Sequence, residues 1–251
     1  AIIVLYVDDL LCLSRNPQDA ESIRSRLFER FNIRTERNDH IVGLSVNHDR
    51  ARGILNISHE SMADDIVASA GLSDCRPVST PLPPHTVTTK KDCPVDEDRQ
   101  ALSQMASRYR SLVGKLMYLA RFTRPDLLHA VTVLSRYCVN PGEPHNALLK
   151  HCIRYLRGTK DVGITFRRRP QLQLQGFSDS DYAMDIDSRK STTGFVFQIN
   201  GASVCFSSHL QRSVSLSTVE AELYACSVAS ATALFLRRVI IEFADEGFLP
   251  Q

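Results

Sequence analysis

The chain has 251 residues, and 43% of them are apolar, which is enough for one to three small domains with hydrophobic cores. Its 30 Lys and Arg nearly balance its 28 Asp and Glu, so the overall charge favours no class of partner. Seven scattered cysteines without a CxxC pair argue against a zinc site and favour reduced intracellular thiols. No apolar run approaches the ~20 residues of a membrane span, and two aspartates interrupt the apolar residues 1–13, which excludes a secretory signal there.

The first elements along the chain are two β-favouring runs, residues 1–5 and 10–13, around Tyr6-Val7-Asp8-Asp9. This pattern predicts a hairpin with Asp8 and Asp9 at its tip. Because the chain begins with Ala inside a predicted strand, we expect it to be part of a longer protein. Asn16-Pro17 then predicts the start of a helix, because proline favours the first helical position.

The segment up to residue 98 contains strands, a second helix and a proline-rich stretch. Short strands are predicted over residues 41–46 and 54–57, and a helix follows that buries Ile66 and its neighbours and stops at Gly71. Residues 75–98 hold five of the eleven prolines, so we expect a linker or an extended loop.

Residues 107–170 combine helical periodicity with positive charge. Apolar stripes predict three helices over about residues 109–120, 127–137 and 148–156. Thirteen Lys and Arg stand against three Asp and Glu, an excess that is typical either of a polyanion-binding surface or of a solvated basic face. The following basic residues lie mostly off the stripes and are predicted to be free to contact phosphates: Lys115, Arg121, Arg124, Lys150, Arg154 and Arg157.

The last third changes to strands. Residues 162–166 and 172–178 are candidates, and 194–199 and 202–206 flank Asn200-Gly201, the strongest short signal for a hairpin. Ser217 or Thr218 is expected to cap a long helix over about 219–243.

The succession of motifs resembles the Pol polyprotein of copia-type retrotransposons over essentially the whole chain. YVDDLL at 6–11 resembles the palm hairpin of reverse transcriptases. The next matching segments are STPL at 79–82, YRSLVGKLMYL at 109–119, TRPD at 123–126, LSRY at 134–137 and RYLRGT at 154–159. The opening of a ribonuclease H domain is matched by SDSD at 178–181, DSRKSTTG at 187–194 and LSTVEAE at 216–222.

The resemblance implies an α/β (α+β) fold in four parts. These are the C-terminal part of a reverse transcriptase palm (1–74), a Pro/Thr-rich linker (75–106), a basic helical connection (107–170) and a truncated ribonuclease H-like domain (171–251). The implied parent synthesises DNA on an RNA template and degrades RNA in RNA–DNA hybrids. Implied partners are the hybrid, the RNA template, a DNA primer and other parts of the polyprotein, with no membrane; the implied location is a cytoplasmic particle or the nucleus.

The resemblance also assigns catalytic and metal-binding roles to Asp8 and Asp9 of the palm and to Asp179 and Glu222 of the ribonuclease H part. Carboxylates are the usual protein ligands of magnesium (or manganese), and a metal pair suits phosphoryl transfer. We expect Asp179 and Glu222 to converge on a partly formed site. Asp181 stays open as an alternative ligand or an exposed acid, and if Glu220 faces Asp179 the assignment within the motif changes.

Several features depart from the family pattern. The third acid of each carboxylate set is missing, the chain has no tryptophan, and Met184 stands near an expected glycine. We therefore expect this chain alone to be inactive. Two alternatives are a non-catalytic nucleic-acid-binding relic and a domesticated module without a nucleic-acid role; the basic middle segment weighs against the second.

Overall fold

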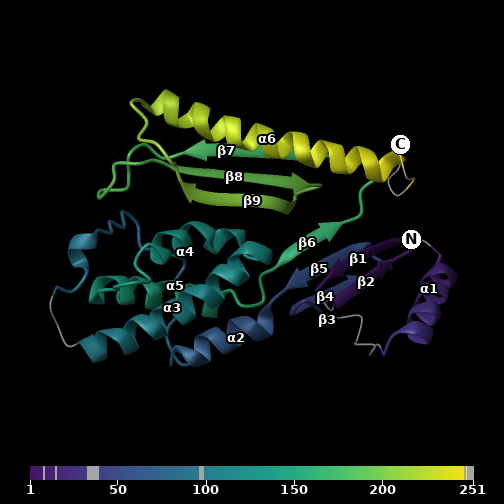
Figure 1. The fold of residues 1–251 in the computed structure, drawn as a ribbon, viewed down its shortest axis with the longest axis horizontal. Helices are drawn as coiled ribbons and strands as arrows, with labels where there is room; N and C mark the ends of the chain where they lie inside the picture. The colour runs from purple at the N-terminus through teal and green to yellow at the C-terminus, as the bar shows by residue number, and fades with distance from the viewer. Residues whose placement is uncertain (8, 15, 33–39, 96–98, 246, 248–251) are drawn as a thin grey trace.

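The structure, a computed structural model, describes residues 1–7, 9–14, 16–32, 40–95, 99–245 and 247. Helices combine with three sheets in which all described strand pairs are antiparallel, so the fold is α+β. Figure 1 shows a small hairpin at one end, a helical bundle, and a three-stranded sheet between the bundle and the long helix α6.

The predicted N-terminal hairpin is confirmed. Strand β1 (Ile2–Tyr6) pairs with β2 (Asp9–Leu13), and Tyr6 lies opposite Asp9. Asp9 therefore begins the second strand beside the turn, whereas Asp8 lies outside the described residues. Helix α1 (Pro17–Arg30) follows, and the Asn16 side chain accepts a hydrogen bond from the Gln18 amide at 3.1 Å, which confirms the predicted start.

A four-stranded sheet joins two distant parts of the sequence. Its order is β3 (His40–Ile41), β4 (Leu44–Asp49), β5 (Ile54–Ser58) and β6 (Ile164–Arg167). Just before β6, a Cβ on Gly163 would lie 2.3 Å from the Ile57 carbonyl oxygen, so glycine permits this close approach. The sheet thus draws on both the predicted palm segment and the predicted connection.

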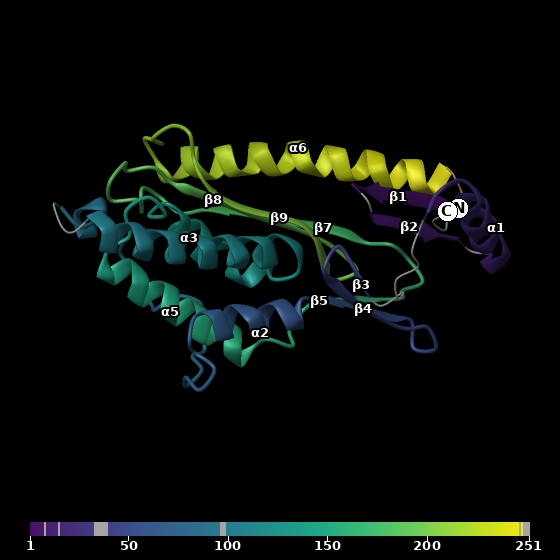
Figure 2. The ribbon, with the colours of Figure 1, turned by 60° about the horizontal axis from the view of Figure 1, so that its bottom comes forward.

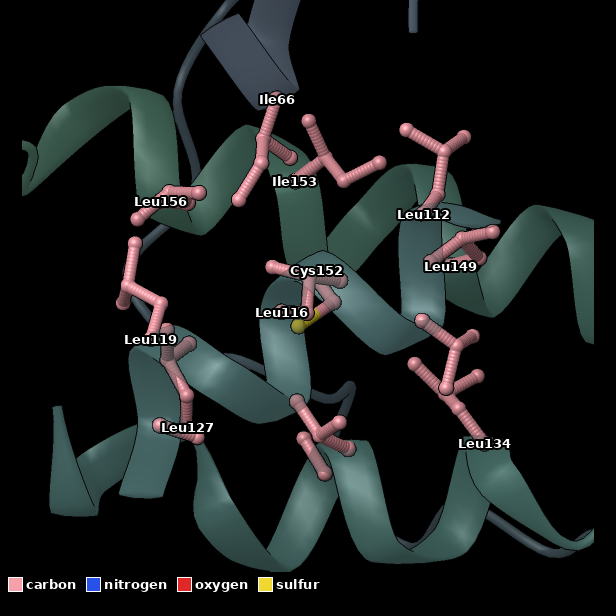
Figure 3. Packing of buried hydrophobic residues seen from close by; sticks show 14 of the residues in the cluster. Ile66, Leu112, Leu116, Leu119, Leu127, Leu134, Leu149, Cys152, Ile153 and Leu156 are labelled. Carbon is pink, nitrogen blue, oxygen red and sulfur yellow. The ribbon is translucent and has the colours of Figure 1, made fainter. Parts of the chain in front are cut away.

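The main hydrophobic core lies in a helical bundle. It consists of α2 (Glu60–Ser69), α3 (Arg99–Phe122), η2 (Pro125–Leu127), α4 (Leu128–Ser135) and α5 (Glu143–Gly158). Figure 3 shows Leu116 and Cys152 near the centre, with Ile66 of α2 inserted from the side. The second predicted helix therefore belongs to the same core as the three helices of the connection. Gly71, at φ +70°, ends α2 as predicted.

The proline-rich segment lies along this bundle. The Arg154 Nε donates to the Arg76 carbonyl at 2.8 Å, and Arg157 donates to the carbonyls of Ser73 and Cys75, both at 2.6 Å. Further along, the segment forms η1 (Lys90–Asp92), where the Lys90 amide donates to Asp187 at 2.8 Å. Side chains of α5 thus hold the start of this segment, and Asp187, between β7 and β8, holds its later part.

The third sheet has the order β7 (Leu174–Ser180), β8 (Thr192–Ile199), β9 (Ala202–Leu210). Asn200 and Gly201 have φ of 52° and 86°, as the predicted tight turn requires. Figure 2 shows α6 (Thr218–Asp245) on one side of this sheet and the bundle on the other.

Helix α6 packs on the sheet through small residues. Ala221, Ala225 and Ala229 are its buried residues, and α6 contacts β7 and β8. Its predicted cap is confirmed at Ser217, whose Oγ accepts from the Glu220 amide at 3.1 Å. Contrary to the sequence expectation, α6 is long and apolar enough to cross a membrane by length and composition. A single helix of this kind is weak evidence, so no membrane contact follows from its length and composition.

Candidate nucleic-acid site

The acidic hairpin lies close to an aromatic cluster of the bundle. Asp9 is half-buried, and the pKa of the Tyr118 hydroxyl on α3 is raised by burial and, further, by electrostatic interactions with Tyr6 and the Asp9 carboxylate. The Tyr118 hydroxyl donates to the Val42 carbonyl at 2.9 Å, and its ring meets the buried His59 ring edge-on. Nothing in this arrangement tests the catalytic role predicted for Asp9.

A second acidic site lies between the bundle and the third sheet. It is an open cavity of about 420 Å³ whose lining includes Asp179, Asp181 and His129 among mainly apolar side chains. The other lining residues are Pro125, Leu128, Phe177, Ser178, Thr192, Gly194, Phe195, Val196, Phe206, Ser207 and Ser208. His129 was not among the predicted site residues, although it is a polar residue inside an apolar helical run.

The register of β7 decides which way Asp179 points. Side chains alternate along a strand, so Asp179 shares a face with Phe177, while Ser178 and Ser180 occupy the other. Phe177 lies in the row of Phe206, which packs against the bundle core. Asp179 therefore faces the bundle.

The opposite face of β7 meets α6. The Gln211 Nε2 lies 3.1 Å from both the Ser180 hydroxyl and the Ala221 carbonyl of α6, which joins the two elements. Glu222, the next residue along α6, is exposed, and Glu220 accepts from the Leu216 amide at 2.7 Å in the helix cap. The convergence of Asp179 and Glu222 stays a prediction, and it requires Asp179 to turn around the end of its strand.

Asp181 and its surroundings are held firmly. Its Oδ1 accepts from the Thr192 amide at 2.5 Å. Burial lowers the pKa of His129, and the positive charge of Arg136 lowers it further, while the negative charge of Asp181 partly opposes the shift. The net pKa lies below its usual value, so the imidazole is neutral at pH 7. Arg136 pairs with Asp185 at 3.1 Å, which ties α4 to the segment after β7. The cavity is thus a fixed junction between bundle and sheet.

Arg124, predicted to be free for phosphate, is instead a buried structural residue. Only 1% of it is exposed, and its guanidinium chelates Asp126 at 3.0 and 2.7 Å. It also donates to the carbonyl and the hydroxyl of Thr159 at 2.7 and 2.6 Å. These bonds engage the Arg124 guanidinium on both of its sides, so the prediction that Arg124 is free to contact phosphate is wrong. An arginine that lies off an apolar stripe can still be buried where a helix begins.

The other predicted phosphate contacts fall into two groups. Arg154 and Arg157 donate to carbonyls of the proline-rich segment, and Lys115 lies 3.4 Å from the Ser69 hydroxyl. Arg121 and Lys150 are exposed, and within the described part of the chain neither has a hydrogen bond or an ion pair. The basic surface is therefore smaller than the sequence count implies.

The described residues do not form a metal site by themselves. Among them, no three His, Cys, Asp or Glu side chains lie close enough together to hold a metal ion. Asp9, Asp179 and Glu222 therefore do not fit magnesium without further ligands, and no chemical step through a metal can be derived from this structure.

Comparison with known proteins identifies the family. The chain is 35% identical over 243 residues to the "Retrovirus-related Pol polyprotein from transposon TNT 1-94" of Nicotiana tabacum, which covers 96% of this chain and 18% of that protein. It is 32% identical to the RE1 transposon Pol polyprotein of Arabidopsis thaliana, over 87% of this chain and 14% of that protein. The chain thus spans less than a fifth of each of these polyproteins.

A shorter relative matches along nearly its whole length. It is an uncharacterized mitochondrial protein of Arabidopsis thaliana, AtMg00810, 31% identical over 91% of both chains. No family profile and no solved structure matches this chain. The chain belongs to the family of retrovirus-related Pol polyproteins of transposons, and it corresponds to one segment of such a polyprotein.

Proposed function

We propose that this chain is the segment of a copia-type Pol polyprotein in which the reverse transcriptase meets the ribonuclease H domain. The observation that carries the proposal is the match over 96% of the chain to a transposon Pol polyprotein, together with the ordered motifs. The parent then synthesises DNA on RNA and degrades RNA in RNA–DNA hybrids, with magnesium or manganese, in a cytoplasmic particle or the nucleus. RNA template, DNA primer and the rest of the polyprotein are its partners.

In this proposal the bundle contacts the hybrid through phosphates and without base specificity. Arg121 and Lys150 support it, because both are exposed and have no partner among the described residues, so they are available to a polyanion. Asp9 and Asp179 keep the catalytic roles that the motifs assign, Asp8 and Glu222 complete the proposed acids, and each set needs ligands from elsewhere in the polyprotein.

Hybrid binding is expected to weaken steeply with salt. Each neutralised phosphate releases counterions, so the logarithm of the affinity should fall linearly with the logarithm of the salt concentration. The slope of this line should be about −0.9 for each phosphate that the protein contacts. Fluorescence anisotropy of a labelled hybrid, at several salt concentrations, measures this slope. The double variant Arg121→Gln/Lys150→Gln should flatten it by about two, while Arg26→Gln, at an exposed arginine of α1 outside the bundle, should leave it unchanged. An affinity indifferent to salt, or no binding at low salt, contradicts the proposal.

The purified chain is expected not to cleave a hybrid at a useful rate. A metal pair that is held by too few carboxylates is loosely positioned. Small displacements of the reacting groups can then cost on the order of 10²-fold in rate. Incubating the chain with a labelled hybrid and magnesium tests this. Cleavage that the Asp179→Asn variant abolishes contradicts the expected inactivity, and it supports the assignment of Asp179.

A non-catalytic nucleic-acid-binding protein is the second candidate. One observation favours it: AtMg00810, a relative of similar extent, matches over 91% of both chains rather than lying within a long polyprotein. Adding a segment that supplies the missing acids distinguishes the two. Restored cleavage favours the polyprotein segment, whereas binding without cleavage in the extended chain favours the second candidate.

A further inference from the structure

An open surface cavity of about 410 Å³, lined mostly by exposed residues, lies between the C-terminal end of α2 and the middle of α3. Its polar lining consists of Ser69, Gln104, Ser107, Arg108, Ser111 and Lys115. Leu112 is its one apolar lining residue in the described chain, and no acidic residue lines it there. The cavity is separate from the acidic cavity at Asp179, with which it shares no lining residue.

The lining follows from the periodicity of α3. Gln104, Ser107, Arg108, Ser111 and Lys115 recur at steps of three and four residues, so they form one polar stripe along the helix. Serine is a weaker helix former than alanine. Helix stability alone therefore does not account for two serines that lie one turn apart and are flanked by two cations. The stripe brings hydroxyl, amide and cationic donors to one place.

Contacts with α2 hold the two cations without neutralising them. The Arg108 Nη2 donates to the carbonyls of Ser69 and Ala70 at 3.3 and 3.4 Å, and the Lys115 Nζ lies 3.4 Å from the Ser69 hydroxyl. These bonds are long and use one nitrogen of Arg108. In the described chain neither cation is paired with a carboxylate. Both charges and most of their donors remain available to a ligand.

We propose that this cavity binds a phosphate group, and that in the parent function the group is a phosphodiester of the RNA–DNA hybrid. A phosphate offers several strong acceptors to the donors of the cavity, and a positive lining without acids favours an anion. The volume exceeds that of a lone phosphate, so the attached sugars have room. The phosphodiester assignment rests on the proposed function, whereas the phosphate site does not.

Charge-neutral variants test the site most directly. The double variant Ser107→Ala/Ser111→Ala removes two donors and no charge, and alanine favours the helix, so folding should be preserved. We expect its hybrid affinity to fall about tenfold at constant salt, because two hydrogen bonds at exposed serines are lost and each makes only a modest net contribution in contact with water. Ser103→Ala, on α3 outside the cavity, is the matched control and should leave the affinity unchanged.

A charge variant and inorganic phosphate identify the ligand. Lys115→Gln should reduce the salt slope by about one, and inorganic phosphate, titrated by calorimetry, should bind the wild type and lose binding in the serine variant. If the serine variant loses phosphate binding but keeps its hybrid affinity, the cavity is still a phosphate site, and its ligand is a free anion rather than the hybrid. If the wild type binds hybrid and the serine variant alters neither ligand, the site is refuted while the proposed function stands. If the wild type binds no hybrid, the proposed function fails and the phosphate titration alone decides the site.

Discussion

Replacing Arg124 with alanine should lower the free energy of unfolding by about 3 kcal/mol, the lower end of the range for breaking a buried ion pair. The guanidinium is buried, and its loss removes the charge partner of Asp126, which keeps only the Tyr155 hydroxyl as a side-chain donor, and one of the two donors to the Thr159 carbonyl. The lower end is expected because the Asp126 side chain is 35% exposed and water can solvate its charge. Urea unfolding followed by circular dichroism measures the change. Arg121→Ala, an exposed arginine three residues earlier at the end of α3, should change it by less than about 0.5 kcal/mol.

The same pair should make stability depend on pH. Burial alone would raise the pKa of Asp126, but the hydrogen bond and charge of Arg124 outweigh it, and the pKa lies below its usual range. Because the folded pKa is depressed, this stabilisation is present above the unfolded pKa of about 3.9 and is lost as the pH falls through the folded value. Arg124→Ala should therefore lose less stability than the wild type between neutral and strongly acidic pH. An unchanged acid transition would exclude the pair as its cause.

Local rules in the sequence predicted the elements that depend on neighbouring residues. Asn16-Pro17, Gly71 and Asn200-Gly201 begin, end or join elements where expected, because capping and positive φ are set by a few adjacent residues. The role of Arg124 could not be predicted in this way. Its burial depends on Thr159 at the end of α5, and only the packed helices bring the two together.

Pairing between distant segments was also beyond the sequence. No local pattern says that β6 adds to β5, or that α2 enters the core of the connection helices. For the candidate site, the sequence placed Asp179 near the end of a strand, and the structure has it next to last in β7. The face of the sheet to which Asp179 points was not predictable, because a shift of one residue in register turns every side chain to the other face of the sheet.

Ile66→Ala should destabilise the helical bundle by about 2–5 kcal/mol, the range for truncating a large buried aliphatic side chain. Ile66 is fully buried and packs from α2 into the core of α3, α4 and α5 (Figure 3). The truncation loses the burial of three carbons and leaves a cavity that a rigid bundle cannot refill. Although the sequence assigned α2 to the palm segment, its loss of packing should lower the stability of the connection helices as well.

Ile23→Ala is the matched control, because it is the same truncation on α1, a helix in which no residue is buried. It should cost less than about 1 kcal/mol, since its side chain is only partly withdrawn from water. Hydrogen exchange should show faster opening of amides in α3 and α5 for Ile66→Ala and not for Ile23→Ala, because residues in one core unfold as a unit. If the exchange of α3 and α5 is unaffected by Ile66→Ala, α2 does not share their cooperative core, and the boundary after residue 74 separates two independent units.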